Sequence, residues 1–178
     1  MNLYFRFIFL VLSRVLFSKR QEISDTCVTK FRVSLFDLDL NFHMNNGRFF
    51  TIMDLGRFDL LLGTGFFFKL IRHGYYPVVL SESAVFRRSL TLFQKFSVET
   101  SIDSIDHKFF YMTQKFVHED RLVASTNVRV CFKNWGRKGV VPPEELYEFF
   151  GVPYEHKELS PLAQKQIELD DALAPRQV

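Results

Sequence analysis

The sequence has few of the residues that stabilise small secreted proteins or bind metals. Its 178 residues include only two cysteines, Cys27 and Cys131, and both lie in strand-like runs. This position is typical of buried free thiols, although a disulfide between the two is compatible with the sequence. Apart from His43, the histidines have no metal-ligand spacing, so we expect neither a metal nor a cofactor.

Sequence motifs of several enzyme classes are also missing. The chain has no G-x-S-x-G, H-E-x-x-H or phosphate-binding motif, and Gly63-Thr64-Gly65 lacks the third glycine of a dinucleotide-binding loop. The net charge of +3 is too small to indicate a nucleic-acid partner. Because 47% of the residues are hydrophobic and 22 are phenylalanine, we expect a folded domain with a substantial core rather than a disordered chain.

The N-terminal segment, residues 1–21, has no acidic residue and no apolar run long enough to span a membrane. Its longest unbroken apolar run, Phe7 to Leu12, is far shorter than the roughly 20 residues that cross a bilayer. No small-residue cleavage site follows it, so a cleaved signal peptide is not indicated. An uncleaved signal anchor stays open as an alternative.

At helical spacing, this N-terminal segment divides into an apolar side and a basic side. The apolar side carries Tyr4, Ile8, Val11, Leu12 and Val15, and the basic side carries Asn2, Arg6, Ser13 and Arg20, with Arg14 at its border. The pattern predicts a basic amphipathic helix on an anionic membrane surface, which would make the protein cytoplasmic and peripheral to a membrane through residues 1–20. The alternative is a helix packed onto its own domain.

Residues 22–150 have the pattern of one antiparallel sheet and one long helix. A period of two predicts a strand from Cys27 to Leu35, and a helical apolar stripe predicts a buried helix from Gly47 to Gly63, with Gly56 allowing a sheet to approach closely. A second short helix is expected over residues 66–74, and further strands over 77–90, 95–105, 108–117 and 122–133. Residues 151–178 form a polar tail with a helix expected from Pro161 to Leu173. This α+β order resembles the hotdog fold, an antiparallel sheet wrapped around a long central helix.

The stretch FDLDLNFHMNN, residues 36–46, places polar side chains among leucines and phenylalanines directly before the long helix. Asp39, Asn41 and His43 match D-x-N-x-H, which resembles the signature of plant acyl-carrier-protein thioesterases of the hotdog superfamily. The 4-hydroxybenzoyl-CoA thioesterase family resembles it more loosely, with an aspartate at the place of Asp39. The basic apolar N-terminus and the run MNNGRFFTIMDLGRFD resemble the thioesterase-superfamily-member-6 type.

This resemblance implies an enzyme that hydrolyses an acyl-CoA or acyl-carrier-protein thioester to the free acid and thiol. Asp39 would act as general base or nucleophile, Asn41 would orient it or the water, and His43 would act as acid/base or orient the substrate. The start of the helix presents free backbone N–H groups and a positive dipole end, so we expect Asn45, Asn46 and Gly47 to bind the thioester carbonyl.

Structural explanations exist for the same residues. Aspartate and asparagine are favoured in turns and at helix N-termini for purely local reasons. Asp37 lies outside the motif, and we expect it to cap or brace the loop. A calcium loop starting at Asp37 is excluded, because its sixth residue is Phe42 rather than glycine and its twelfth is Arg48 rather than glutamate.

Three further features have both a functional and a structural interpretation. Glu82 alternates with apolar residues on its strand, so it would either line the acyl site near His43 or pair with an arginine. Asp54 and Arg57 are explained by a surface ion pair on the helix. The basic loop NWGRKG, residues 134–139, would meet coenzyme A phosphates or be simply solvated.

Three functions are compatible with this pattern: a thioesterase, a protein that binds acyl chains without hydrolysing them, and a dehydratase of the same fold. The motif favours the thioesterase over the dehydratase. A single repeat leaves sheet edges and half a substrate cleft, so we expect a homodimer or a dimer of dimers.

Overall fold

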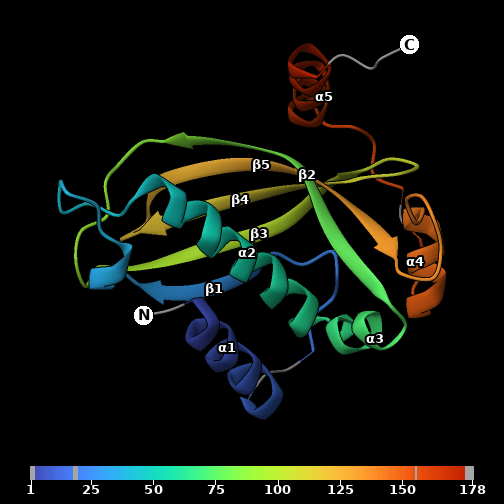
Figure 1. The fold of residues 1–178 in the computed structure, drawn as a ribbon, viewed down its shortest axis with the longest axis horizontal. Helices are drawn as coiled ribbons and strands as arrows, with labels where there is room; N and C mark the ends of the chain where they lie inside the picture. Colours follow the sequence, from blue (N-terminus) through green and yellow to red (C-terminus); the bar gives the residue numbers. More distant parts are fainter. Residues whose placement is uncertain (1–2, 18–19, 155, 175–178) are drawn as a thin grey trace. The chain divides into compact units, whose positions relative to one another are not determined.

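The computed structural model describes residues 3–17, 20–154 and 156–174 (Figure 1). Its elements are α1 (Leu3–Phe17), β1 (Cys27–Arg32), the 3-10 turn η1 (Leu35–Asp37), α2 (Asn46–Gly63), α3 (Phe66–Arg72), β2 (Tyr75–Phe86), β3 (Lys95–Ile105), β4 (Phe110–His118), β5 (Arg121–Asn134), α4 (Pro143–Phe150) and α5 (Pro161–Leu173). The expected order of one strand, a long helix, a short helix and four strands is confirmed.

The strands form one antiparallel sheet in the order β1-β3-β4-β5-β2. β1 pairs with β3, with Cys27 opposite Thr100 and Arg32 opposite Lys95. β1 and β2 are therefore the edge strands of this sheet, and α2 follows β1 along the chain. Both cysteines are buried free thiols, as expected from their strand positions.

The chain divides into two compact units. Unit 1 contains residues 1–68, 85–101 and 114–125, and unit 2 contains residues 69–84, 102–113 and 126–178. Unit 1 therefore includes α1, β1, η1, α2 and the whole stretch FDLDLNFHMNN. Unit 2 includes α4 and α5 together with most of β2 and β5.

In unit 1, α2 buries the apolar stripe expected from its sequence. Phe49, Ile52, Met53 and Leu60 are buried. A Cβ on Gly56 would lie only 2.9 Å from Thr100 Oγ1 and 3.0 Å from Gln114 Nε2, so glycine is what lets α2 approach β3 and β4 this closely. Gln114 Nε2 also donates to the Met53 carbonyl oxygen at 3.0 Å.

The ion pair expected between Asp54 and Arg57 is present on α2, and its Asp54 side chain is 50% exposed. The Arg57 side chain is only 11% exposed, and its Nη1 donates to Gln114 Oε1 at 2.8 Å. Spacing along α2 indicated the pair, but it carries no information about the buried amide of Gln114 that β4 presents to Arg57.

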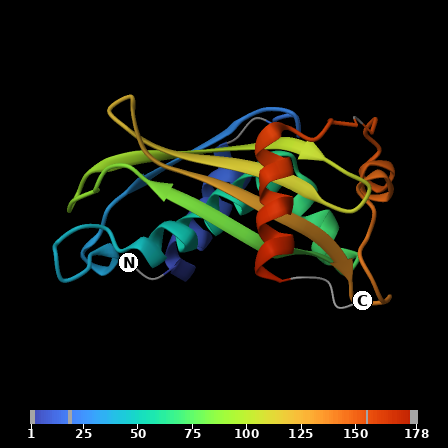
Figure 2. The ribbon, with the colours of Figure 1, turned by 90° about the horizontal axis from the view of Figure 1, so that it is seen from above.

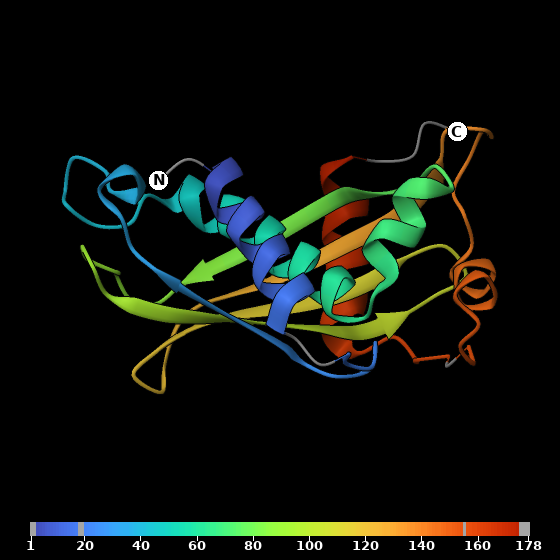
Figure 3. The ribbon, with the colours of Figure 1, turned by 90° about the horizontal axis from the view of Figure 1, so that it is seen from below.

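Helix α1 packs against α2 (Figures 1 and 3). The Phe7 ring contacts the Phe58 ring edge-on, with 5.4 Å between centroids. Arg6 and Arg14 point into unit 1 and pair with Asp37 and Asp59. The exposed side of α1 is apolar and carries Tyr4, Phe5, Ile8, Phe9, Leu12, Val15 and Leu16. Within the described part of the chain, no helix is long and apolar enough to cross a membrane.

The structure thus shows the helix packed onto its own domain through the side that was expected to face anionic lipid. Asn2, which was assigned to that side, lies outside the described residues. Arg20 donates from Nε to the Thr64 carbonyl oxygen. A basic residue on an amphipathic helix reaches a buried carboxylate as readily as a phosphate, so the helical pattern alone does not distinguish the two.

In unit 2, α5 lies across the strands (Figure 2). Ser81 on β2 donates to Asp170 Oδ2 at 2.7 Å, and Arg129 on β5 donates to the same oxygen at 3.0 Å. Ala163 and Gln166 of α5 are buried. The helix expected from Pro161 to Leu173 is confirmed, and it packs onto unit 2 rather than extending as a solvated tail.

Candidate functional site

The stretch FDLDLNFHMNN forms a compact loop between β1 and α2. The 3-10 turn η1 ends at Asp37, and a bridge between Leu38 and Met44 then closes the loop. The Met44 N–H donates to the Leu90 carbonyl oxygen at 2.7 Å, and His43 forms a bridge with Thr91. The path from β1 through this loop to the start of α2 can be followed in Figure 2.

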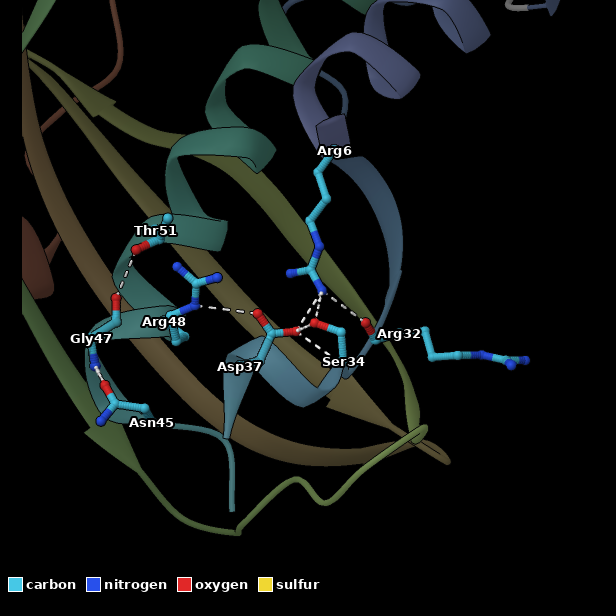
Figure 4. A network of polar contacts seen from close by, with 8 residues as sticks. All are labelled: Arg6, Arg32, Ser34, Asp37, Asn45, Gly47, Arg48 and Thr51. Atoms are coloured by element: carbon cyan, nitrogen blue, oxygen red, sulfur yellow. Dashed lines mark hydrogen bonds and ion pairs between the residues drawn. The ribbon is translucent and has the colours of Figure 1, made fainter. Parts of the chain in front are cut away.

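Asp37 is the best-connected residue of the loop (Figure 4). Its carboxylate is fully buried and accepts hydrogen bonds from the Ser34 N–H and hydroxyl, both at 2.8 Å. Arg6 Nη2 lies 2.5 Å from Asp37 Oδ2, and Arg48 Nε lies 3.3 Å from Oδ1. The expectation that Asp37 braces the loop is confirmed. The two arginines were missed, because no sequence pattern connects Arg6 with Asp37.

The charge state of Asp37 follows from these contacts. Burial alone raises the pKa of the Asp37 carboxyl, but the Ser34 hydrogen bonds and the Arg6 guanidinium outweigh it and hold the pKa below its usual range. Asp37 is therefore an anion at neutral pH. An anion with no exposed surface and with four donors around it serves the structure of the loop rather than proton transfer.

Asp39 lies at the tip of the loop and is half-buried. Its Oδ1 accepts the Asn41 N–H at 2.8 Å and the His43 N–H at 3.4 Å, and the Asp39 N–H donates to the His43 carbonyl oxygen. Phe42 has a φ of 59°, which lets the chain reverse between Asn41 and His43. Asp39 therefore performs the local turn function expected of an aspartate.

The second oxygen of Asp39 is what distinguishes it from an ordinary turn residue. No hydrogen bond to Asp39 Oδ2 is found among the residues that the structure describes. Asn41 and His43 are exposed, so all three motif side chains are accessible in the single chain. The structure thus brings Asp39, Asn41 and His43 together on one short turn, and their catalytic roles stay a prediction.

The start of α2 provides the candidate carbonyl-binding groups. Asn45 is the N-cap, and its Oδ1 accepts the Gly47 N–H at 2.8 Å. The Gly47 N–H is therefore already occupied, and the Asn45 side chain has a capping role. Among the described residues, no acceptor forms a hydrogen bond with the Asn46 N–H. Of the candidate groups at the start of α2, the backbone N–H of Asn46 is thus the one that stays our predicted donor to an oxyanion.

Glu82 belongs to unit 2, whereas the other six predicted site residues belong to unit 1. It is half-buried on β2, and its neighbour on the same face, Leu80, is 48% exposed. The apolar face that was expected to enclose Glu82 is therefore only partly covered in the single chain, because β2 is an edge strand. Its role near His43 stays a prediction.

Three further features are relevant to a role in substrate or metal binding: a groove in unit 1, clusters of metal-ligating side chains, and the basic loop NWGRKG. A groove of about 830 Å³ in unit 1 is lined by residues of α1, β1, α2 and β3 that include Arg6, Arg14 and Asp59, but not by the three motif residues. Across the described ranges, no cluster of three or more histidine, cysteine or acidic side chains is arranged to hold a metal ion. In unit 2, Arg137 of the loop NWGRKG pairs with Glu145.

A family model described as the thioesterase-like superfamily matches residues 33–150. The chain belongs to this superfamily. The matched region contains the loop, α2 and the remaining sheet strands of this thioesterase-like protein. It does not contain α1 or β1.

Comparisons with individual proteins agree with this assignment. Protein THEM6 of Danio rerio is 35% identical over 118 residues, which cover 66% of this chain and 56% of the relative. This thioesterase-like chain spans about half the length of the curated relatives it matches.

Two solved structures share the hotdog fold. YbaW, a probable thioesterase from Escherichia coli, has a TM-score of 0.64 at 21% identity over 69% of this chain and 95% of its own. The DHNA-CoA thioesterase from Staphylococcus aureus has a TM-score of 0.65 at 12% identity over 86% and 97%. The fold expected for this thioesterase-like chain is therefore confirmed.

Proposed function

We propose that the protein hydrolyses acyl thioesters, with an acyl-CoA or an acyl-carrier protein as substrate. The observation that carries this proposal is a carboxylate and a backbone donor on one continuous segment: Asp39 lies in the loop before α2, and the Asn46 N–H belongs to the first residue of α2. Membership of the thioesterase-like superfamily supports the reaction class. Of two solved neighbours, YbaW is named a probable thioesterase, and the protein from Staphylococcus aureus is named a thioesterase of the coenzyme A thioester DHNA-CoA.

The reaction requires water to attack the thioester carbonyl and the C–S bond to break. In one route, Asp39 removes a proton from the attacking water and the same proton passes to the departing thiolate. In the other, Asp39 attacks the carbonyl carbon, expels the thiolate and forms an anhydride that water then hydrolyses. In both routes the carbonyl oxygen becomes negative, and the Asn46 N–H with the N-terminal end of the α2 dipole stabilises that charge.

His43 and Asn41 have supporting roles in this proposal. An imidazole can accept and donate a proton, so His43 can deliver a proton to the departing thiolate. Asn41 can orient the attacking water or the Asp39 carboxylate through its amide. Both side chains are exposed on the same turn as Asp39, which is compatible with contact to a substrate.

The experiment is a panel of acyl-CoA and acyl-carrier-protein thioesters of increasing chain length, assayed by release of free thiol. Turnover of at least one class above the uncatalysed rate supports the proposal. Tight binding of acyl-CoA without thiol release would instead favour the non-catalytic binding protein. The panel also assigns the carrier and the preferred chain length, neither of which the fold determines.

The edge strand β2 supports assembly as a homodimer, or a dimer of dimers. β2 is an edge strand of the sheet, and its Val79, Leu80 and Val85 side chains are exposed. An apolar strand edge is a template for pairing with a second strand, so a second copy of this chain is the partner we propose. Light scattering at micromolar concentration tests this, and a monomeric mass would contradict it.

We also propose a peripheral membrane location, but its driving force differs from the attraction to anionic lipid that the sequence indicated. Arg6 and Arg14 are used inside unit 1, whereas the apolar side of α1 is exposed. Binding through α1 would therefore come from burial of apolar area in the lipid interface rather than from attraction to anionic headgroups. This predicts vesicle binding with little dependence on lipid charge or salt.

A further inference from the structure

We infer that Arg6, on α1, is a positioning residue for the candidate catalytic loop. This inference rests on the proposed function. Arg6 lies outside residues 33–150, the region that matches the thioesterase-like family model. An N-terminal helix beyond that region would therefore be an integral part of the site in this chain.

The first step is the contact between Arg6 and the loop (Figure 4). The Arg6 side chain is only 6% exposed, and its Nη2 lies 2.5 Å from Asp37 Oδ2. The same nitrogen donates to the Arg32 carbonyl oxygen at 3.1 Å and lies 3.4 Å from Ser34 Oγ. One guanidinium thus connects the end of β1, the N-cap residue of η1 and the buried carboxylate of the last residue of η1.

The second step leads from Asp37 to the reacting groups. The Asp37 carbonyl oxygen accepts the Asn45 N–H at 2.8 Å, and its Oδ1 accepts Arg48 Nε from the first turn of α2. Asp37 therefore fixes the N-cap residue directly before the Asn46 N–H. It also lies two residues before Asp39 in the chain. Asp37 therefore holds both proposed reacting groups, Asp39 and the Asn46 N–H, and Arg6 of α1 balances its negative charge.

The third step is the consequence of removing Arg6. Asp37 would keep Arg48 and Ser34 but lose its shortest cationic contact while it remains fully buried. A buried carboxylate that loses its cation tends to move toward water or to take up a proton. Either response releases the turn from Asp37 to Asn45, and with it the geometry between Asp39 and Asn46.

A second arginine on the same helix provides a matched control. Arg14 Nε lies 2.5 Å from Asp59 Oδ1, and its Nη2 lies 2.9 Å from Oδ2. Asp59 is buried on α2, far along the chain from the loop. Both arginines attach α1 through a buried aspartate, but only Arg6 contacts the loop. Comparing them separates attachment of α1 from positioning of the site.

The experiment compares the full chain with Arg6→Gln, Arg6→Lys and Arg14→Gln. Unfolding by urea, kcat and KM for the best thioester, and hydrogen exchange at the Asp39, Met44 and Asn45 amides are measured for each. We expect both glutamine variants to lower stability. Only Arg6→Gln should accelerate hydrogen exchange in the loop and also lower kcat. We expect kcat to fall by about 10-fold or more, since a 1 Å misplacement of reacting groups costs roughly 10²-fold in rate. KM should change less, and Arg6→Lys should recover part of kcat because it keeps the charge and the donors.

Equal kcat and equal loop exchange in Arg6→Gln and Arg14→Gln would overturn the inference. If the wild type hydrolyses no thioester, the proposed function fails, and exchange at Asn45 still decides whether Arg6 holds the loop. If Arg6→Gln does not fold, the double variant Arg6→Gln/Asp37→Asn removes the unbalanced charge. It should fold and still show faster loop exchange and lower kcat, and wild-type values in both measurements would refute the role of Arg6.

Discussion

The backbone N–H of Asn45 donates to the carbonyl oxygen of Asp37 at 2.8 Å. This bond joins the last residue of η1 to the N-cap of α2 and closes the loop that carries Asp39, Asn41 and His43. The residues proposed for chemistry therefore lie between two fixed points, one held by Asp37 and the other by the helix. Substitutions within this loop can therefore distinguish residues that take part in the reaction from residues that only hold the loop in place.

The first prediction concerns Asp39. Asp39→Asn keeps the side-chain oxygen that accepts the Asn41 N–H, so the turn should persist, but it removes the charge needed for a base or nucleophile. We expect kcat for the best thioester to fall by roughly 10²-fold or more with little change in stability. His43→Ala should lower kcat by a smaller factor if His43 only orients the substrate.

A matched control for this substitution is Asp120→Asn. Asp120 is exposed in the turn between β4 and β5 and has a φ of 59°, which asparagine tolerates. Its kcat should equal that of the wild type. Equal activity in the wild type and in folded Asp39→Asn would reject Asp39 as the catalytic carboxylate.

The second prediction concerns the Asn46 N–H. Asn46 is the first residue of α2, where proline is well tolerated, and Asn45 has φ −62° and ψ 138°, which suit the residue before a proline. Asn46→Pro should therefore remove one N–H without breaking the helix. Loss of one oxyanion donor typically lowers kcat by roughly 10²- to 10³-fold.

Asn46→Ala is the control, because it keeps the N–H and removes only the side chain. Its rate should stay near that of the wild type, and circular dichroism should show intact helix in both variants. A normal rate in folded Asn46→Pro would exclude this N–H as the oxyanion donor.

The third prediction concerns Asp37 and pH. Asp37→Asn leaves Arg6 buried without its anion, and removal of one partner of a buried pair costs about 3 to 5 kcal/mol of unfolding free energy. Since the folded-state pKa of Asp37 is depressed, its stabilisation is fully present above the unfolded pKa of about 3.9 and is lost as the pH falls through the lower folded value. Urea unfolding at pH 7 should therefore show a large difference between wild type and variant, and the difference should shrink below about pH 4. A difference that is constant across this range would contradict the assigned ion pair.

The fourth prediction concerns the exposed side of α1. Ile8→Ser, Leu12→Ser and Val15→Ser in one variant should abolish binding to lipid vesicles, neutral and anionic alike, because they remove the apolar area that would enter the interface. Stability should change little, since Arg6, Arg14 and Phe7 hold α1 from the other side. The control variant Leu162→Ser/Leu173→Ser alters exposed positions of α5 and should bind vesicles as the wild type does.

Deletion of residues 1–20 is a less informative test than these serine substitutions. Without Arg6 and Arg14, Asp37 and Asp59 would be buried without the cations that α1 supplies. The truncated protein is therefore expected to be destabilised, and a loss of vesicle binding would not report on α1 alone. Co-sedimentation of the serine variant equal to that of the wild type would refute membrane binding through α1.

Most of the fold could be predicted from local patterns. The strand from Lys95 to Ile105 and the helix from Pro161 to Leu173 have the predicted ends, and α2 begins one residue before the predicted Gly47. Alternation and helical stripes are imposed by the geometry of each element, so they are legible in the sequence. The capping and turn roles of Asn45 and Asp39 were legible for the same reason.

The long-range electrostatic contacts could not be predicted in this way. Arg6 and Asp37 are 31 residues apart, and Arg14 and Asp59 are 45 apart. Which acid a given arginine meets depends on how α1 packs onto α2, and no sequence periodicity encodes that packing. For the same reason, the sequence did not reveal that Arg57 contacts Gln114 on β4 inside unit 1.

The sequence by itself determined the α+β order of elements, the buried stripe of α2 and the motif from Asp39 to His43, because these depend on spacing within a single segment. Only the tertiary structure decided which side of α1 faces inward. It turned Arg6 and Arg14 toward buried aspartates, since a buried carboxylate requires a compensating cation, and left the apolar side of the helix exposed. An amphipathic pattern defines two sides of a helix, and the partner that each side meets is fixed only when the chain packs.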